Sequence, residues 1–339
     1  MVTMAYNNNK QSGAVLLTVL IVLTMLTLLI ASAHSILSSR LELAQQAKAL
    51  VDSKALVQGK INQLTYLAAT QRFTAAGIST GRNKDRLTKL DGQWNFSLTY
   101  DEYRLDSYQY SEQKGNRTLQ FSLQAVNGLI PVNTESDFWL DQWLEGYGIN
   151  VTNSQKYKDT LLDYIDADSD TRAAGAEQMS YPTKYPMPLP TNYFIQDCSE
   201  LSLMPHWNEL IESNPDIINE CSTGYSSALN INAIPASLLT KLWPEKKEQI
   251  LAKREGNEWF SSLDSLTLVV NNLDLNRELL YRFSSDGSLI IKVSADSYTE
   301  TRKVELGTGL LPPFTFFVTS ATLGSVSNNT ERADQNMND

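Results

Sequence analysis

A run of apolar residues about as long as a bilayer core is thick lies near the start of the chain. It occupies the stretch NKQSGAVLLTVLIVLTMLTLLIASA, residues 9–33, and no ionised side chain occurs between Lys10 and Arg40. A secretory signal peptide has a shorter apolar core, and small residues at a cleavage site come after that core. The length therefore predicts a membrane-spanning helix over residues 14–34. Lys10 is the only basic residue before it, which weakly favours a cytoplasmic N-terminus. Length and charge alone indicate a plain membrane anchor.

A second apolar pattern follows the run and has the period of a helix. The positions that recur every seven residues are Leu43, Leu50, Val57 and Leu64, and the same side carries Ala47, Ile61 and Ala68. Lys54 is the one break in this stripe. The pattern predicts an amphipathic helix that continues to about Thr70, roughly 80 Å from Ala14 at the usual rise per residue. A coiled-coil stalk and a helix packed on a sheet both fit it.

Alternating patterns take over after the helix. A polar loop with Gly77, Gly81 and Gly92 precedes QWNFSLTY (93–100), which alternates strictly. The stretches YRLDSYQY (103–110) and TLQFSLQAV (118–126) follow, with the turn-like EQKGNR between them. These patterns predict half-buried antiparallel strands. A long helix followed by such a meander indicates an α+β fold.

The pattern then changes to helices and loops from about Glu135 to about Arg282. A strand pair returns in SLIIKVSAD (288–296) and YTETRKVEL (298–306). A sheet that stops and later resumes suggests a helical domain inserted between its strands, and insertions at exposed loops are well tolerated.

The residues before the apolar run suggest a family. Gly13 directly precedes the apolar stretch that begins Ala14-Val15-Leu16-Leu17-Thr18. A polar leader that ends in Gly before an apolar helix resembles the class III leader of type IV pilins and type II secretion pseudopilins. The resemblance implies that a prepilin peptidase cuts between Gly13 and Ala14, and it implies methylation. Most members carry Glu at the fifth mature position. Thr18 stands there instead, and a missing Glu is the usual mark of the type II secretion protein K family.

Three further stretches resemble that family. They are NGLIPVNT (127–134), LLDYIDADSDTRAAGAEQ (161–178), and the segment from Ala228 to Leu266, which resembles a helix-hairpin-helix. In the last stretch Asn232 can cap a helix and Pro235 fits a first turn. Two short helices are expected around Trp243-Pro244, and a third after Trp259-Phe260.

The resemblance implies a pilin-like α+β domain with a large inserted helical domain. The expected parts are a leader at 1–13, the transmembrane segment at 14–34, a pilin-like helix and first strands at 35–134, the inserted helical domain at 135–283, returning strands at 284–322 and a disordered tail at 323–339. It also implies a single-pass protein of the bacterial inner membrane with its bulk in the periplasm.

The expected function is that of a non-enzymatic minor pseudopilin. The resemblance implies a complex with the minor pseudopilins I and J at the pseudopilus tip, where the helical domain blocks further stacking, and contacts with the assembly platform and membrane lipid. Thr18 would mark the tip position. A minor pilin of a type IV pilus is the alternative within this class. A membrane-anchored, calcium-dependent hydrolase is the alternative from another class.

Nucleic acid is not an expected partner, although some helix-hairpin-helix segments bind DNA. Duplex binding needs a basic face, and the chain has a net charge of −10. The turn between the first two expected helices of this segment contains Pro244 and lacks Gly. The basic residues Lys246, Lys247, Lys253 and Arg254 are therefore expected on a solvated helix face.

Carboxylates gather in the acidic stretch 161–178. Those with the one, three, five and twelve spacing of an EF-hand loop are Asp166, Asp168, Asp170 and Glu177. The match is partial, because Thr171 stands where an EF-hand needs Gly, and Gly175 comes four residues later. A cation, Arg172 or water must relieve their mutual repulsion, and a solvated acidic loop is the alternative.

The family resemblance implies that calcium binds these four carboxylates. The family often has Asp after Gly-Ala-Glu, and this chain has Gln178. One ligand is then missing or comes from elsewhere. Asp163 is a candidate, although it could also cap a helix or face solvent.

The two cysteines, Cys198 and Cys221, are expected to form a disulfide if the domain lies in the oxidising periplasm. Such a bridge closes a loop of roughly two dozen residues and stabilises by a few kcal/mol. Two buried free thiols are the alternative. The only histidines are His34 and His206. No Ser–His–Asp or Cys–His set can be assembled from them, so no enzyme is predicted.

Two further stretches remain, one rich in Pro and Tyr and one apolar. The segment 181–194 is rich in Pro and Tyr, and it fits an ordered connection or a binding loop. The apolar residues 310–322 suggest an extra strand on the sheet.

Overall fold

The computed structural model describes residues 11–83, 88–90, 93–95, 100–134, 136–181, 188–256, 258–270, 273, 275–306 and 314–323. Most of the predicted leader, residues 1–10, lies outside this range, and so do residues 324–339 of the tail that the sequence predicts to be disordered. The chain divides into two compact units, Met1–Ala55 and Leu56–Asp339. It is a mixed helix and sheet structure that begins with a long apolar helix.

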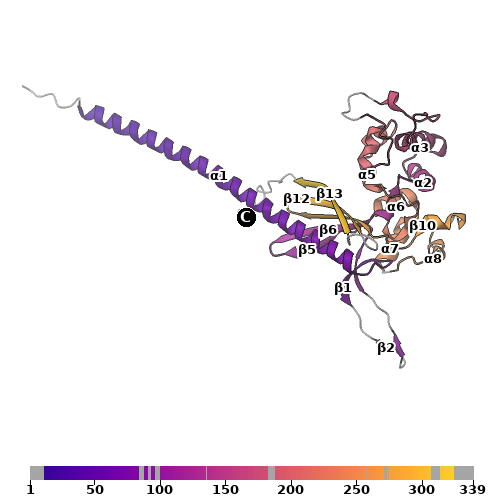
Figure 1. Ribbon diagram of the computed structural model, residues 1–339. Helices are drawn as coiled ribbons and strands as arrows, with labels where there is room; N and C mark the ends of the chain where they lie inside the picture. The colour runs from indigo at the N-terminus through magenta and orange to yellow at the C-terminus, as the bar shows by residue number, and fades with distance from the viewer. Residues whose placement is uncertain are drawn as a thin grey trace, which may run out of the picture. The chain divides into compact units, whose positions relative to one another are not determined.

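Helix α1 (Gln11–Thr70) is the first element (Figure 1). Its apolar side chains are exposed from Val15, which is 63% exposed, to Leu43, which is 65% exposed. Within the described part of the chain, α1 is the one helix long and apolar enough to cross a membrane, judged by length and composition. The predicted anchor therefore corresponds to a continuous apolar helix.

The last four turns of α1 pack as part of the second unit. Val57, Ile61 and Leu64 are fully buried. Nη1 of Arg302 in β12 donates a hydrogen bond to the side chain of Asn62 at 3.1 Å. Because burial of the predicted stripe begins at Val57, this part of the structure supports a helix packed on a sheet over a coiled-coil stalk.

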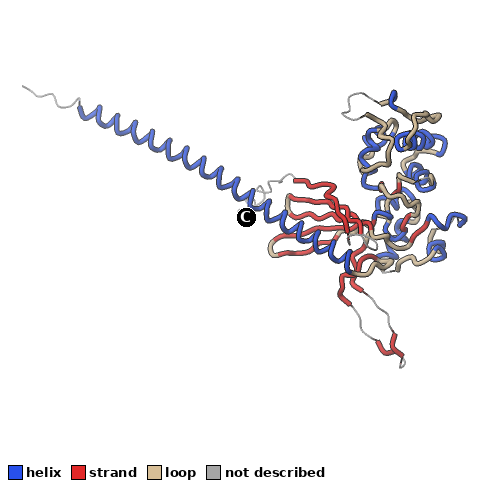
Figure 2. The backbone as a smooth tube through the Cα atoms, in the orientation of Figure 1, coloured by secondary structure: helices blue, strands red, loops and turns tan. Residues whose placement is uncertain are grey.

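The main sheet has five antiparallel strands in the order β13-β12-β11-β6-β5 (Figure 2). Its strands are β5 (Tyr110–Lys114), β6 (Arg117–Ala125), β11 (Ser288–Ala295), β12 (Tyr298–Leu306) and β13 (Phe314–Leu323). The alternating residues of β11, such as Leu289 and Ile291, are fully buried. β13 pairs with β12 at one edge, so the extra strand expected from the apolar residues 310–322 is confirmed from Phe314 onward.

The predicted polar loop after α1 is wrong in part, because it contains a strand. β1 (Gly77–Asn83) pairs antiparallel with β4 (Tyr100–Arg104). Gly77 has a φ of +154°, and a Cβ there would lie 2.0 Å from the carbonyl oxygen of Tyr103. Glycine is needed at this position because the two strands approach each other closely. The sequence predicted Gly77 only as part of a polar loop.

The predicted strand 93–100 is described only in part, and the predicted strand 103–110 is interrupted. In the first, β3 (Gln93–Asn95) pairs with β2 (Thr88–Leu90), and residues 96–99 lie outside the described ranges. In the second, β4 ends at Arg104 and β5 begins at Tyr110. Ser107 between them has a left-handed φ of 63°, and Asp106 is held by side-chain bonds, so alternation there does not produce one strand.

In the chain, the helical segment follows β6 and precedes β11. These two strands are hydrogen-bonded neighbours in the sheet. Its α-helices are α2 (Phe138–Gly146), α3 (Val151–Ile165), α4 (Trp207–Ser213), α5 (Ile217–Glu220), α6 (Ala236–Leu242), α7 (Lys247–Glu255) and α8 (Leu263–Thr267). Its 3-10 helices are η1 (Val126–Gly128), η2 (Gln178–Ser180), η3 (Cys198–Leu203), η4 (Ile231–Ala233) and η5 (Leu275–Leu280). Two short parallel pairs, β7 (Ile130–Pro131) with β8 (Cys221–Ser222) and β9 (Leu229–Asn230) with β10 (Tyr281–Arg282), complete it.

The two ends of this segment meet at a hydrogen bond. The Asn127 side chain donates to the carbonyl oxygen of Ser284 at 3.1 Å, 157 residues later. Nearby, a Cβ on Gly128 would lie 2.3 Å from the carbonyl oxygen of Ala233, so the NGLIPVNT stretch packs tightly against η4. A core of buried aromatic and aliphatic side chains, including Trp139, Trp143 and Trp207, fills the segment.

Candidate functional site

The acidic stretch is fixed to the last turns of α3 by carboxylates on one face of that helix. Asp159 Oδ2 accepts a hydrogen bond from the backbone N–H of Ala174 at 3.1 Å. Asp163 Oδ2 accepts one from the backbone N–H of Arg172 at 3.2 Å, and its side chain is fully buried. Residues four apart in a helix share a face, so α3 presents both carboxylates to the returning loop. The idea that Asp163 faces solvent is wrong.

A guanidinium neutralises part of this charge. Nη1 of Arg172 donates to Asp163 and to Asp166, each at 2.5 Å. The two carboxylates hold the pKa of Arg172 above its ordinary value. Arg172 is therefore the group that relieves the repulsion in this structure, which was one of the three options that the sequence left open.

Gly175 is required for the approach of the loop to α3. A Cβ at Gly175 would lie 1.9 Å from Oδ2 of Asp163. Gly175, which does not occupy the EF-hand glycine position, is therefore needed for a different reason. It lets the backbone of the loop lie against the buried carboxylate of Asp163.

Two carboxylate oxygens in this cluster have no partner among the described residues. Oδ1 of Asp166 and Oε1 of Glu177 are buried without a hydrogen bond. Burial raises the pKa of Glu177, and the negative charges of Asp163, Asp166 and Asp168 raise it further. Unpaired buried carboxylate oxygens are costly, and hard cations such as Ca²⁺ take oxygen ligands of this type.

The four predicted ligands are only partly brought together. Asp168 and Asp170 are exposed, and Oδ1 of Asp168 accepts a hydrogen bond from the backbone N–H of Asp170 at 2.9 Å. Within the described part of the chain, no three His, Cys, Asp or Glu side chains are arranged around one point for a metal ion. The donor chemistry of Asp166 and Glu177 fits a hard cation, while the guanidinium of Arg172 lies beside Asp166.

Asp159 was not predicted to be part of this site, and Asp163 was predicted as a substitute ligand, a helix cap or a solvent-facing residue. The available signal was their spacing of four residues within a helical pattern that leads into the acidic stretch. A linear EF-hand template starts at Asp166 and therefore leaves out the helix that holds the loop.

The cysteines Cys198 and Cys221 form a disulfide with a Cα–Cα distance of 6.0 Å. Cys198 begins η3 and Cys221 begins β8, so the bridge joins the two loops that follow the acidic stretch.

The helix-hairpin-helix segment has the helices that the sequence predicted, in α6, α7 and α8. Pro235 directly precedes α6 as its N-cap residue. Asn232 is not a helix cap: its side chain accepts from the N–H of Phe260 at 3.1 Å and donates to the carbonyl oxygens of Phe260 and Phe283. It is buried and clamps three parts of the segment, which the sequence could not distinguish from a cap.

The predicted solvated basic face is wrong for one of its members. Arg254 in α7 is 1% exposed, and its guanidinium binds Asp106 together with the carbonyl oxygens of Ile231 and Ile234. Lys253 is paired with Glu258 at 2.7 Å on the surface, as expected of a solvated charge. The hairpin thus points its arginine inward.

In the apolar part of α1, the hydroxyl of Thr18 donates to the carbonyl oxygen of Val15 at 2.9 Å. Thr24 makes the same bond to Ile21 at 2.8 Å. Both hydroxyls are satisfied within the helix, which makes threonine tolerable in an apolar environment.

Comparison with known proteins places this geometry in a family. Residues 120–212 match the family model described as type II secretion system (T2SS), protein K. The chain contains a protein K domain of the type II secretion system. The resemblance that the sequence predicted is confirmed, and the chain is a minor pseudopilin of that system. The matched residues include most of β6, all of α2 and α3, and the whole acidic stretch.

A solved structure is also similar to the chain. It is the crystal structure of the GspK-GspI-GspJ complex from the type 2 secretion system of enterotoxigenic Escherichia coli, which aligns at 11% identity with a TM-score of 0.49, covering 84% of this chain and 98% of that one. None of the curated proteins matches the chain. The description of the matching family names a component of a secretion system and no catalytic activity.

Proposed function

We propose that this minor pseudopilin acts without enzymatic activity at the tip of a pseudopilus, where it initiates assembly with the minor pseudopilins I and J and so supports the export of folded proteins across the outer membrane. The match of residues 120–212 to protein K is the observation that carries this proposal. It favours a type II secretion system over a type IV pilus. The large helical segment between β6 and β11 is the bulk that would stop a further subunit from stacking above it.

The proposed location is the inner membrane, with α1 as the single span and the rest of the chain in the periplasm. The exposed apolar side chains from Val15 to Leu43 support a lipid environment for this part of α1. The Cys198–Cys221 disulfide supports an oxidising compartment for the second unit. The assembly platform is the proposed contact at the membrane.

The test is co-purification from membranes. The tagged full chain, expressed with the I and J proteins of the same organism and extracted in mild detergent, should retain both partners through a salt wash. A tagged major pseudopilin of the same system serves as the matched control and should retain neither in equal proportion. A full chain that loses both partners while I and J still bind each other would contradict the proposal.

The leader is proposed to end at Gly13, where a prepilin peptidase would cut before Ala14. A side chain at position 13 should block cleavage, because the peptidase must fit this residue beside the scissile bond. Gly13→Leu is therefore expected to leave the leader attached, whereas a change at Gln11 should not. Intact-mass measurement of the membrane-extracted protein decides, and a mature N-terminus other than Ala14 counts against the class III leader.

Calcium is the proposed cofactor. Asp166 and Glu177 would hold it through the oxygens that lack partners, with Asp168, Asp170 and the buried Asp163 as further donors. Bound calcium would supply positive charge where carboxylates now repel each other. This chain's own contribution is the rigid attachment of the loop to α3 through Asp159 and Asp163.

A further inference from the structure

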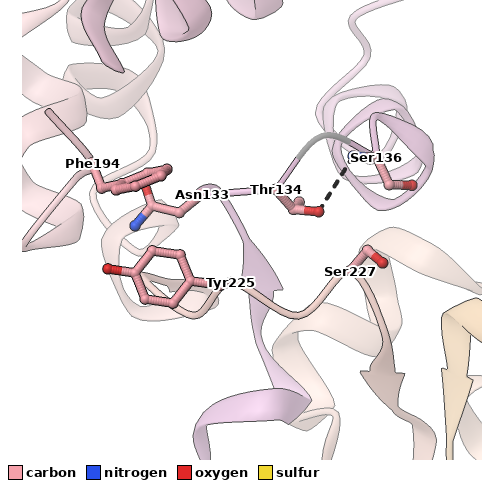
Figure 3. A pocket seen from close by; sticks show the side chains of 6 residues that line it. All are labelled: Asn133, Thr134, Ser136, Phe194, Tyr225 and Ser227. Carbon is pink, nitrogen blue, oxygen red and sulfur yellow. Dashed lines mark hydrogen bonds between the residues drawn. The ribbon is translucent and has the colours of Figure 1, made fainter. Parts of the chain in front are cut away.

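An open pocket has no lining residue from the acidic stretch, and the described side chains that line it are all uncharged. Its volume is about 580 Å³, and its lining residues are Asn133, Thr134, Ser136, Phe194, Tyr225 and Ser227 (Figure 3). They come from three loops: the one between β7 and α2, the one before η3, and the one between β8 and β9. Pockets that place aromatic rings beside a few polar groups are typical of small-ligand sites.

Two aromatic rings stand exposed on one side of this pocket. Phe194 and Tyr225 are 43% and 64% exposed, and their rings lie edge to face with centroids 5.1 Å apart. Tyr193 is 60% exposed and extends the aromatic surface, with its ring centroid 5.9 Å from that of Phe194. Clustered exposed aromatic surface is unfavourable in water and marks interaction sites.

The loops that carry the rings are held rigidly. Asn133 is 4% exposed, and its side chain donates to the carbonyl oxygens of Ile195 and Thr223 and accepts from the N–H of Ile195. Each of these partners lies within two residues of one of the rings. The Cys198–Cys221 disulfide ties the same two loops together a second time. A preformed site loses little entropy when a ligand binds.

Hydroxyl-bearing residues also line the pocket. Figure 3 shows Thr134, Ser136 and Ser227 beyond Asn133 from the ring pair, with their hydroxyl oxygens drawn away from the rings. Oγ1 of Thr134 accepts a hydrogen bond from the N–H of Ser136 at 3.3 Å. The hydroxyls of Ser136 and Ser227 make no hydrogen bond to any residue that the structure describes, so they can bond a ligand.

We propose that this pocket binds a neutral oligosaccharide. The C–H groups of a sugar ring carry partial positive charge and stack on the negative faces of aromatic rings. Sugar hydroxyls can exchange hydrogen bonds with the serine and threonine hydroxyls of the lining. An anionic ligand would need a cation, and the described lining residues include none. An apolar peptide would leave the hydroxyls without partners. The proposal goes beyond the tip assembly function and does not depend on it.

Binding of neutral trisaccharides to the detergent-solubilised full chain tests this proposal. Chitotriose, cellotriose, maltotriose and mannotriose are each titrated at up to about 10 mM and followed by saturation-transfer NMR. At least one should bind, and Tyr225→Ala should weaken it by about tenfold or more, the size of a lost stacking contact. Tyr66→Ala is the matched control, because Tyr66 is also 64% exposed but lies on α1.

Because Tyr225 is exposed, its replacement is expected to leave the melting temperature of the chain unchanged. An unchanged melting temperature in the experiment would show that the variant is folded. Failure of all four sugars to bind would overturn the proposal. Binding that survives Phe194→Ala combined with Tyr225→Ala would overturn it as well. Loss of I or J from the co-purified complex in that double variant, without any sugar binding by the parent chain, would show that the pocket is a protein contact instead.

Discussion

The guanidinium of Arg254 in α7 lies 3.0 Å from the carboxylate of Asp106, 148 residues earlier in the chain. Both side chains are almost fully buried, and Asp106 also binds Arg104 on β4. Burial lowers the pKa of Arg254 to about 10, although the charge of Asp106 opposes the shift. This pair joins the helical segment to the loop between β4 and β5, so it connects the two kinds of structure in the second unit.

Replacing Arg254 by Ala should strongly destabilise the protein. Removing one partner of a buried ion pair typically costs about 3 kcal/mol or more, and here the carbonyl oxygens of Ile231 and Ile234 would also lose their donor. Urea unfolding of the detergent-solubilised chain measures the change. The neighbouring Lys253→Ala is the control and should cost less than about 1 kcal/mol, because its pair with Glu258 is on the surface. Equal losses for the two variants would contradict the role of the buried pair.

A second buried cation should make stability depend on acid. Nζ of Lys60 on α1 lies 2.6 Å from Glu112 on β5 and 4.1 Å from the ring centroid of Phe121. The hydrogen bond from Lys60 holds the pKa of Glu112 below its ordinary value of 4.5. A carboxyl whose pKa is lowered by folding stabilises the folded state above its unfolded pKa, and this contribution is lost as the pH falls through the folded value.

Glu112→Gln should therefore be less stable than the parent at about pH 6, and the gap should narrow towards about pH 3 as Glu112 itself becomes neutral. Urea midpoints at the two pH values give the comparison. Glu305→Gln is a suitable control, since Glu305 pairs with Lys303 at a more exposed site on β12. A gap that stays constant with pH would show that Glu112 acts through packing and not through its charge.

The secondary structure was predictable where one period runs without interruption. The amphipathic half of α1 and the strands β6, β11 and β12 follow from their patterns, because helix and strand burial repeat at 3.6 and 2.0 residues. The apolar half of α1 follows from its length. The split between β4 and β5 was not predictable, since alternation continues through residues 103–110. What breaks the strand is the side chain of Asp106, whose partner Arg254 is distant in sequence.

The acidic stretch was recognisable, but its internal arrangement was not. The charges and their spacing identify 161–178 as a cluster. The role of Arg172 as a bridge between Asp163 and Asp166, and of Gly175 as a close contact, depends on how the loop folds back on α3. Such contacts are tertiary and leave no periodic signal. For the same reason the burial of Lys60 was not predictable. In the amphipathic pattern it looks like a surface lysine, but it is 4% exposed.

Calcium is expected to raise the melting temperature of the full chain in detergent. A ligand that binds only the folded state stabilises it by mass action, and here it would also offset the repulsion that raises the pKa of Glu177. The rise should disappear when Asp168→Ala is combined with Glu177→Ala. A double replacement of exposed carboxylates outside the cluster, Glu209→Ala with Glu212→Ala, should keep it.

The comparison is made between excess calcium and chelator, with magnesium as a second cation. Identical melting curves in calcium and chelator would mean that Arg172 alone balances the cluster and that the stretch is a solvated acidic loop. A rise that persists in the Asp168 and Glu177 variant would place the ion elsewhere.

Thr18 is expected to be the residue that permits a position above all other subunits. In the family that the chain resembles, the fifth mature residue is usually Glu, which meets the free amine of a neighbouring subunit within the membrane. A carboxylate in lipid is costly unless a cation offsets it. A subunit with no neighbour above it would leave such a Glu unpaired, whereas the Thr18 hydroxyl is already satisfied by the carbonyl oxygen of Val15.

Thr18→Glu should therefore leave secretion no better and can impair it, while Thr18→Val should be tolerated because an apolar side chain costs nothing in lipid. Export of a reporter substrate by a strain that carries each variant is the measurement. Thr24→Val is the matched control, since Thr24 makes the same bond within the helix but lies outside the fifth position. Loss of export with Thr18→Val, together with full export with Thr18→Glu, would mean that this position pairs with a subunit above it, and the tip assignment would then be wrong.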